Sequence, residues 1–240
     1  VLTALAEPLR GPSDTGVPGE SVAPATVHLL WSVRLPRIVM ALLVGAALAL
    51  AGTVMQAVFR NPLAEPGVTG VSSGAAVVAV LLIVTGVAQA VPWSLPLGAF
   101  AGAFLTVTLV QVIAGARGGP GTLLLIGIAL NAFLGAVIAA LVVNAPAAED
   151  AQQAMFWLNG DLTAATWRDV GLAVLPILVG GAVLIAFIPE LNMFLLSEES
   201  AAAAGVRTTA VRHLLLALAA LITAAGVAVT GVISFVGLVV

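Results

Sequence analysis

Two long stretches without a charged residue, 38–59 and 68–116, limit this chain to a membrane-embedded fold. A helix needs about 20 apolar residues to cross a bilayer, and both stretches are long enough. The whole chain is 61% hydrophobic and only 8% charged, whereas soluble domains are about a quarter charged. The stretches are continuous, unlike the alternating segments of about ten residues in membrane β-barrels. We therefore expect an all-α, polytopic bundle of transmembrane helices.

Six membrane-crossing segments are predicted, all rich in Ala, Val and Leu with scattered Gly, as in packed transmembrane helices. They cover residues 38–58, 69–91, 97–116, 123–143, 170–188 and 209–230. The longer connections are 1–37, 144–169 and 189–208. Residues 1–6 resemble the apolar tail of a missing helix before a polar stretch rich in Pro and Gly, and 231–240 are apolar without a closing polar flank. We therefore expect 1–240 to be a single domain truncated at both ends, with further spans in the full protein.

The connections alternate between two sides of the predicted bundle. One side holds 1–37, the Pro92-Trp93 turn and 144–169, and the other holds 60–68, 117–121 and 189–208. The first side carries all the tryptophans, Trp31, Trp93, Trp157 and Trp167. Trp prefers the headgroup level, which supports the alternation. The arginines divide evenly, Arg10, Arg34, Arg37 and Arg168 against Arg60, Arg117, Arg207 and Arg212, so the positive-inside rule assigns no orientation.

Several kinds of chemistry are excluded by residues that the sequence lacks. Without lysine the chain cannot carry a standard phosphate-binding P-loop, and without cysteine it has no disulfide, thiolate nucleophile or Cys-ligated metal. His28 and His213 are too few and too separated for a metal centre. The predicted span interiors hold no acid or base, which argues against an ion-coupled carrier and a membrane enzyme. The net charge of −3 implies no nucleic-acid surface.

A polar segment with two prolines, 60–67 (RNPLAEPG), separates the first two apolar runs. It cannot face lipid as a helix, because proline removes backbone hydrogen bonds and unpaired polar groups are costly in hydrocarbon. It can form a tight turn at the membrane surface or inside a protein-lined pathway. The segment is therefore a candidate gate or contact loop.

Polar and small residues inside the spans have two interpretations each. Gln56 and Asn131 are the best candidates for lining a pathway, and the alternative is an interhelical hydrogen bond worth ~0.6–2 kcal/mol. Gly98 and Gly102 form a GxxxG pattern that allows close helix approach. We expect this pattern to pack within one bundle rather than at a dimer seam.

The connection 144–169 is predicted to form two short helices. The first covers 147–158 and ends at Asn159-Gly160, and the second is capped by Asp161 or Thr163 and runs to Arg168. Its apolar underside would comprise Met155, Phe156, Trp157 and Trp167. This layer is either an interfacial lid or part of a docking or entry surface.

Two further segments are candidates for contacts with other proteins. Ser197 begins a short helix with acids in its first turn, where the helix dipole favours them, and Gly205 ends it. That helix is either a partner-contact element or a solvated connector. Arg34 and Arg37 lie at the entrance of the first span, where Pro36 is expected to form a turn. The two guanidinium groups either snorkel to the headgroups or bind an acidic partner.

An ordered set of motifs across 31–240 resembles the permease family that imports iron–siderophore complexes, haem and cobalamin as part of ABC transporters. The motifs are 34–37 (RLPR), 45–49 (GAALA), 60–67 (RNPLAEPG), 70–76 (GVSSGAA), 124–130 (LLIGIAL), 156–160 (FWLNG), 196–201 (LSEESA) with Gly205-Val206, and 231–239 (GVISFVGLV). The resemblance implies a homodimer in the bacterial inner membrane with ten helices per subunit. It also implies a cytoplasmic ATPase dimer, which binds the ATP and Mg, and an external substrate-binding protein.

The same resemblance implies roles for individual residues. With the tryptophan side external, Arg34 and Arg37 would meet acids of the binding protein. Residues of two loops and the start of the next helix would form a cytoplasmic gate, namely Asn61, Leu63, Pro120, Gly121 and Leu125. The family's gate turn commonly bears Ser or Thr, whereas this one reads Gly-Gly-Pro-Gly at 118–121.

By the resemblance, 189–208 would be the cytoplasmic coupling segment. Its residues for ATPase contact would be Ser197, Glu198, Glu199, Ala201 and Gly205, and the helix 123–143 would line the pathway. The predicted function is ATP-driven import by alternating access, with ATP hydrolysis on a separate chain and no cofactor or metal bound here. The alternative is a secondary transporter or channel without an ATPase. No residue distinguishes haem, ferric siderophore and cobalamin as cargo, although iron chelates are the family's commonest.

Overall fold

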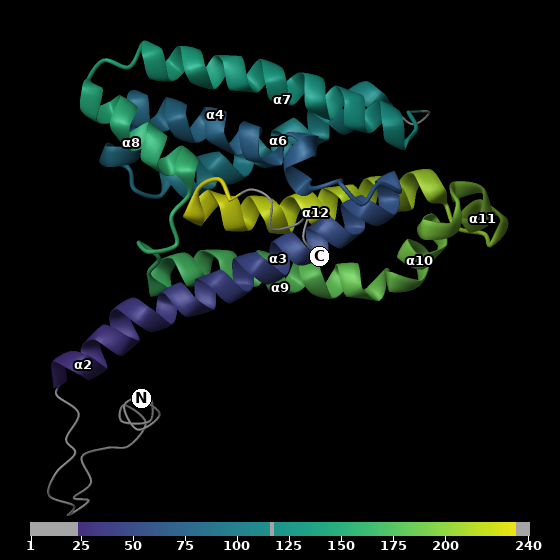
Figure 1. Ribbon diagram of the computed structural model, residues 1–240, viewed down its shortest axis with the longest axis horizontal. Coiled ribbons are helices and arrows are strands. Elements are labelled where there is room, and N and C mark those ends of the chain that lie inside the picture. The colour runs from purple at the N-terminus through teal and green to yellow at the C-terminus, as the bar shows by residue number, and fades with distance from the viewer. Residues whose placement is uncertain (1–23, 116–117, 234–240) are drawn as a thin grey trace, which may run out of the picture.

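The computed structural model describes residues 24–115 and 118–233. The predicted apolar end at 1–6, Arg10, Arg117 and most of the apolar end at 231–240 lie outside the described residues. Within the described part every regular element is a helix (Figure 1). The elements are α2 Pro24–Leu29, the π-helix Leu30–Arg34, α3 Leu35–Phe59, the 3₁₀ helix Pro66–Thr69, α4 Val71–Val84, α5 Val87–Ala90, α6 Ser94–Ala114, α7 Pro120–Val143, α8 Ala148–Asn159, α9 Trp167–Ala186, α10 Ile188–Leu196, α11 Glu198–Ala203 and α12 Thr208–Thr230.

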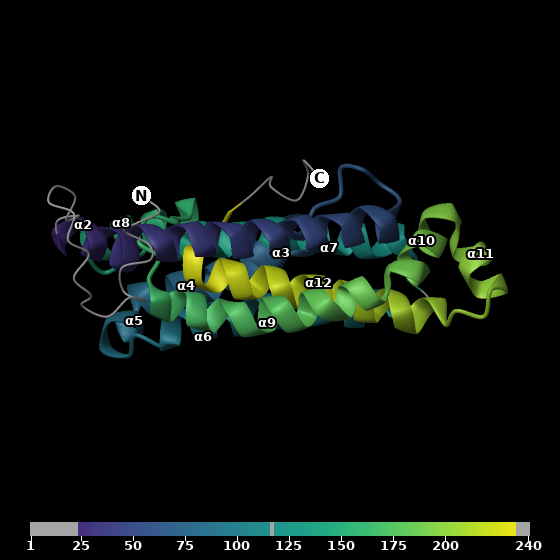
Figure 2. The same ribbon diagram turned by 90° about the horizontal axis from the view of Figure 1, so that it is seen from below.

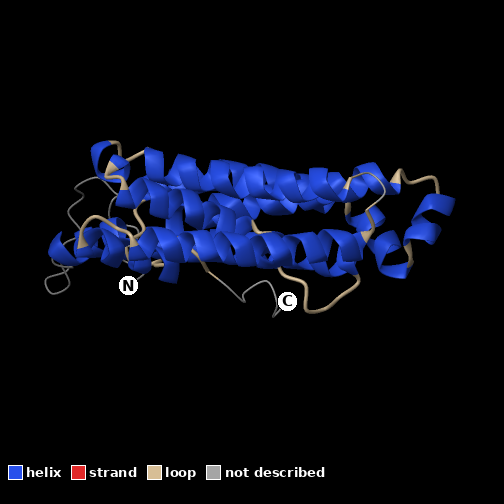
Figure 3. Ribbon diagram, turned by 90° about the horizontal axis from the view of Figure 1, so that it is seen from above, coloured by secondary structure: helices blue, strands red, loops and turns tan. Residues whose placement is uncertain are grey.

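The long helices run along one common axis (Figure 3), and five of those described are long and apolar enough to cross a membrane. This confirms the predicted all-α, multi-pass membrane protein. Helix α12 is central: it packs against α3, α4, α6 and α9, and 67% of its apolar window is buried. Helix α7 lies along one edge of the bundle (Figure 1), and only 6% of its apolar window is buried.

The first span is longer than predicted. The apolar helical stretch begins at Val27 rather than Ile38 and continues without a break to Phe59. The expected turn at Pro36 is wrong, because Pro36 lies in the first turn of α3 directly after the π-helix. Proline lacks the N–H of a helical backbone bond and its ring crowds the preceding turn, and the π-turn that precedes Pro36 changes the hydrogen-bond spacing at this point.

The second predicted span, 69–91, is wrong in length. It is divided into the 3₁₀ helix Pro66–Thr69, the 14-residue α4 and the short α5. Gly70 and Gly86 interrupt it with φ values of 86° and 74°, which side chains rarely adopt. At 1.5 Å per residue α4 rises only about 21 Å, less than the ~30 Å of a bilayer core. The rest of the predicted span lies in the 3₁₀ helix, in the turns at Gly70 and Gly86, and in α5.

The predicted alternation of connections between two sides is confirmed. Helices α2, α5 and α8 lie at one end of the bundle, and α10 and α11 project from the other (Figure 2). We call these the tryptophan end and the α11 end. At the tryptophan end the indole N–H of Trp167 donates to the carbonyl of Trp31 at 2.8 Å, and the guanidinium of Arg168 lies 3.6 Å from the centre of the Trp93 ring.

The connection between α7 and α9 differs from its prediction in two ways. Helix α8 ends at Asn159 with Gly160 at φ 68°, as expected, but no second short helix follows. Thr166 caps α9 instead: its side chain and that of Asp169 form a reciprocal capping box. Met155 and Phe156 are exposed, so the side of α8 that packs inward is built from Ala154 and Trp157 rather than from them. The segment Pro189–Leu196, predicted as loop, belongs to α10.

Helices α4 and α6 touch through glycines. A Cβ atom on Gly74 would lie 2.6 Å from the carbonyl oxygen of Gly102, and one on Gly102 would lie against the carbonyl oxygen of Gly74. A Cβ on Gly98 would meet the side chain of Leu82 on the same partner helix. The GxxxG pattern therefore packs within one bundle, as predicted.

We predict that Gly102→Ala destabilises the protein by about 1–3 kcal/mol, because the new methyl group meets rigid backbone and forces α4 and α6 apart. Thermal unfolding of the purified protein in detergent measures this. Gly135→Ala is the matched control, since nothing lies within 4 Å of a Cβ at that position on α7. Equal midpoints for the two variants would contradict the close contact.

Candidate functional site

The segment 60–70 leaves the α11 end and runs back into the bundle. Arg60 ends α3 with φ 48°, the one positive value among described non-glycine residues. The side-chain oxygen of Asn61 then accepts from the N–H of Leu63 at 2.9 Å, and its carbonyl accepts from the N–H of Ala64 at 3.0 Å. These two bonds close a tight turn. We call 60–70 the re-entrant segment.

Helix α7 holds the inner end of this segment. The side-chain amide of Asn131 donates to the carbonyl of Gly67 at 3.0 Å, and that carbonyl also accepts from the N–H of Gly70. A Cβ on Gly127 would lie 2.6 Å from the carbonyl oxygen of Val68, so only glycine lets the chain approach this closely. Asn131 is about halfway along α7. The re-entrant segment therefore reaches the middle of the bundle before α4 begins.

The five predicted gate residues lie in the re-entrant segment and in the first two turns of α7, at the α11 end. Asn61 and Leu63 form the tight turn of the re-entrant segment, while Pro120 and Gly121 begin α7. The side chains of Leu63 and Leu125 are 67% and 68% exposed. Two large apolar side chains at this end are thus free to contact another molecule, and the gate assignment stays a prediction.

The two predicted pathway residues have structural contacts. Asn131 bonds the carbonyl of Gly67 in the 3₁₀ helix Pro66–Thr69 of the re-entrant segment, which agrees with the predicted alternative of an interhelical hydrogen bond. The backbone carbonyl of Gln56 accepts from the N–H of Asn61 at 3.2 Å and so helps to end α3. Both side chains are partly exposed, and a pathway role for them stays a prediction.

The short helix predicted at the α11 end is present. The hydroxyl of Ser197 accepts from the N–H of Ser200 at 2.9 Å, Glu198 and Glu199 lie in the first turn, and Gly205 follows with φ 87°. Ala201 is its buried residue. A polar depression of about 480 Å³ separates this helix from the re-entrant segment and is lined by Arg60, Ser197, Glu198, Glu199, Ala202 and Thr208.

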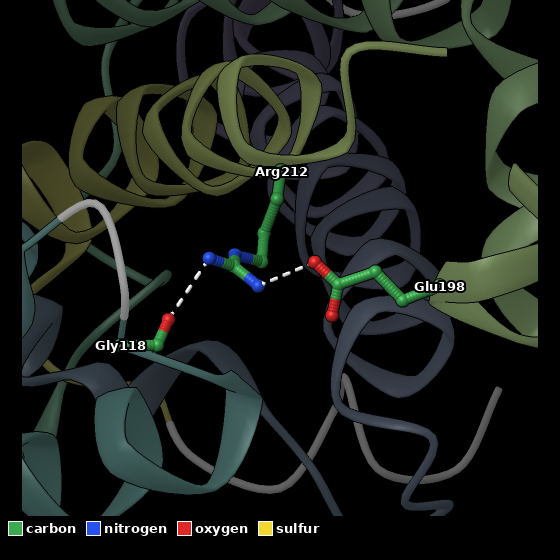
Figure 4. Close-up of polar contacts among 3 residues, drawn as sticks. All are labelled: Gly118, Glu198 and Arg212. Atoms are coloured by element: carbon green, nitrogen blue, oxygen red, sulfur yellow. Dashed lines mark hydrogen bonds and ion pairs between the residues drawn. The ribbon is translucent and has the colours of Figure 1, made fainter. Parts of the chain in front are cut away.

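Arg212 is the residue that sequence reasoning missed. It was expected as a loop charge at a helix start, but its side chain is only 3% exposed. One guanidinium nitrogen donates to Glu198 of α11 at 2.8 Å, and another donates to the carbonyl of Gly118, before α7, at 2.9 Å (Figure 4). It lies in the fifth position of a candidate span, at the helix start that the sequence indicated. No local pattern reveals a partner 94 residues away.

Arg34 and Arg37 are exposed at the tryptophan end, one helical turn apart. Asp161 lies close enough to Arg37 to feel its charge. The Thr163 hydroxyl and backbone N–H donate to the Asp161 carboxylate and hold the pKa of Asp161 below its usual value, and the charge of Arg37 contributes in the same direction. The N–H of Asp161 donates to the carbonyl of Thr230 at 2.7 Å, which joins this connection to the end of α12. Arg37 therefore has an acidic neighbour within its own chain.

We predict that Asn131→Leu loosens the re-entrant segment, because the carbonyl of Gly67 loses a donor worth ~0.6–2 kcal/mol. Hydrogen exchange measured by mass spectrometry should become faster for peptides covering 61–70. Asn144→Leu is the control, since the side chain of Asn144 bonds the carbonyl of Ala140 in its own helix. Unchanged exchange in the Asn131 variant would show that the anchor is unimportant.

We predict that Thr163→Val raises the pKa of Asp161 toward its usual value, since the largest cause of its depression is removed. Because the pKa of Asp161 in the folded protein is below its unfolded value of about 3.9, the ionised carboxylate stabilises the turn fully at pH values above about 3.9. This stabilisation is lost as the pH falls through the folded pKa. In the variant this stabilisation should therefore be smaller, and its loss should be complete at a higher pH than in the parent. Carboxyl NMR titration measures it, with Thr85→Val as control because that hydroxyl bonds only backbone carbonyls. A pKa that stays or falls would refute the assignment.

Comparison with known proteins agrees with this architecture. The chain is 44% identical over 214 residues to the cobalamin import system permease protein of Halobacterium salinarum, covering 88% of this chain and 57% of that protein. It is 39% identical over 230 residues to the hemin transport system permease protein of Yersinia pestis, covering 89% of this chain and 65% of that one. The chain thus spans less than two thirds of the length of these relatives.

A solved structure has the same fold. It is described as an inward-facing conformation of a metal-chelate type ABC transporter, and it superposes with a TM-score of 0.85 at 32% identity, covering 99% of this chain and 75% of that one. The sequence profile described as the FecCD transport family matches residues 14–240. With this match and with relatives of such identity, the chain belongs to the FecCD transport family.

Proposed function

We propose that this chain is the permease subunit of an ATP-driven importer of iron chelates or cobalamin that works by alternating access. The carrying observation is its membership of the FecCD transport family, whose similar members are named as cobalamin and hemin permeases. The chain supplies a path and gates, and ATP is hydrolysed on a partner chain. The tryptophan end would face outward and the α11 end the cytoplasm.

Helix α11 is the proposed contact for the ATPase. It is six residues long, is capped by Ser197 and projects beyond the ends of the long helices (Figure 2). Glu199 and Ala202 are exposed and line the polar depression beside it. A short, capped and polar-flanked helix at one end of a membrane bundle is accessible to a protein outside the bilayer. Closure of an ATPase dimer would push it and reorient the subunits as rigid bodies.

A second copy of the chain is the proposed partner for α7. Of its 24 residues only Leu123 and Gly127 are buried, and Leu125, Ile128 and Phe133 are exposed. A pathway between two copies would be bounded by this apolar surface, and Leu63 and Leu125 would close it at the α11 end. A wide, mostly apolar cavity with few fixed charges suits a large chelate. At the tryptophan end, the exposed Arg34 and Arg37 would bind acids of an external binding protein.

Reconstitution tests the function. The full permease should co-purify with its ATPase and, in vesicles, take up cobalamin, hemin or a ferric siderophore only when ATP is supplied. Running the three cargoes in parallel identifies the chelate. Uptake driven by an ion gradient in the absence of an ATPase would instead support a secondary transporter and reject the proposal.

Glu199→Arg should weaken ATPase binding, because the change reverses the charge of an exposed residue on α11. Retention of the ATPase during co-purification, and ATP-dependent uptake, should both fall by about tenfold, a 1.4 kcal/mol change in binding. Glu149→Arg is the matched control: Glu149 is also an exposed glutamate in the first turn of a short helix, but at the tryptophan end. Equal ATPase retention by both variants would remove α11 as the contact.

A further inference from the structure

We infer that Arg212 is a positioning residue that couples α11 to the start of α7, so that a displacement of α11 moves the turn that begins α7. The part of the inference that concerns ATP rests on the proposed function. The link between the two helices is a property of this chain alone and can be tested by itself.

The geometry joins three segments at one side chain. Arg212 projects from the beginning of α12, with Glu198 of α11 on one side of its guanidinium and Gly118 on the other (Figure 4). The two donor–acceptor distances are 2.8 and 2.9 Å, and the arginine is almost fully buried. The contact with Glu198 is an ion pair as well as a hydrogen bond.

The chemistry of arginine makes this link stiff. Its guanidinium is planar and presents its donors in a fixed fork, so two simultaneous bonds set the relative positions of both acceptors. The bond to Glu198 is charge-assisted and therefore shorter and stronger than a neutral one. A buried charge that loses its partner is strongly destabilised. Movement of α11 should therefore keep Glu198 on Arg212 rather than leave the guanidinium unpaired.

The other acceptor is well placed to move α7. Gly118 directly precedes Gly119, the N-cap of α7, and Pro120, its first residue. The N–H of Gly118 donates to the carbonyl of Gly115 at 3.2 Å, and a Cβ at Gly118 would collide with the backbone of Ala114. The turn is thus packed tightly against the end of α6. A shift of the Gly118 carbonyl has to be followed by the residues that begin α7.

Helix α11 has the boundaries of a movable element. It is bounded by Ser197, whose backbone is extended, and by Gly205 at φ 87°, and element ends of this kind can absorb the change in a hinge motion. Only Ala201 is buried among its residues, while 202–204 are exposed. Helix α11 also packs against α10 and α12, and the bond from Arg212 to Glu198 ties it to the side chain that bonds Gly118. This shared arginine is a direct route by which the position of α11 can reach the start of α7.

Spin labels can measure the link directly, because the sequence contains no cysteine. Cysteines at the exposed positions Ala202 on α11 and Thr122 on α7 carry the two labels in the full permease chain. With Arg212 intact, the distance distribution should be narrow in the permease alone. Arg212→Gln should broaden it. Arg212→Lys should give an intermediate width, because an ammonium keeps the charge but lacks the fork that holds both acceptors.

Two further variants define the link. Glu198→Gln should broaden the distribution, since Arg212 loses its charged partner while the side-chain shape is kept. Arg207→Gln, which removes one exposed positive charge near the same helix, should leave the distribution as in the parent. If Arg212→Gln is not recovered as folded protein, Arg212→Lys decides the question. A parental distribution in the Arg212 variants overturns the inference.

The functional arm uses the permease with its ATPase in vesicles. Arg212→Gln should lower the amount of substrate taken up per ATP hydrolysed at least about fivefold, the lower end of typical coupling between sites. ATP hydrolysis itself should continue. If the variant loses thermal stability but keeps the label distances and the uptake per ATP, the role of Arg212 is purely structural. That result overturns the inference. If the labels respond as expected but no ATPase complex forms, the link stands and the proposed function fails.

Discussion

Backbone hydrogen bonding without water governs this bundle, because unpaired N–H and C=O groups in hydrocarbon cost several kcal/mol each. Helices satisfy that requirement along most of the chain. The re-entrant segment 60–70 is not a continuous α-helix, so individual hydrogen bonds have to pair its polar groups. Three contacts pair them: the Asn61 turn, the bond from the Thr69 hydroxyl to the carbonyl of Pro66 at 2.8 Å, and the bond from Asn131 to Gly67. The depth at which α4 begins follows from these pairings.

Close packing of small residues supplies the second constraint. In lipid there is little hydrophobic gain from bringing helices together, so van der Waals contact has to hold them. Glycines let the backbones of α4 and α6 touch. In the same way, a Cβ atom added at Gly180 on α9 would collide with the side chain of Ile222 on α12. Helix α12 lies at the centre of this packing. Its rigid placement makes its first turns a firm base for the side chain of Arg212.

Helix α7 is held at two points by polar contacts. Its middle is bonded through Asn131 to the re-entrant segment, and the turn before its first residue is bonded through Gly118 to Arg212. Between them, most of its apolar surface is exposed. A helix with a free face and few polar anchors can shift while the bundle core stays packed. Both anchors lead to segments at the α11 end, the end at which the proposed ATPase would bind.

Much of the architecture follows from local sequence. Run length and apolar composition determined the membrane class, since a helix of given length either spans a bilayer or does not. The alternation of sides followed from the spacing of those runs and from the tryptophans. Helices α8 and α11 were predicted because their end signals, Gly160, Ser197 and Gly205, act within one turn. Pro36 was interpreted wrongly, because a π-turn ahead of a proline is not encoded in a local residue pattern. The second short helix capped by Asp161 or Thr163 was also wrong, although Thr166 and Asp169 carry the local spacing of the capping box that begins α9.

The sequence by itself determined that this is a helical membrane protein with a short capped helix at the end away from its tryptophans. Only the tertiary structure decided how deep the re-entrant segment goes and that Arg212 is buried. Both depend on partners far along the chain: Asn131 is 64 residues from Gly67, and Arg212 is 94 residues from Gly118. Such bonds form only after the helices pack side by side, so no local pattern of residue types records them.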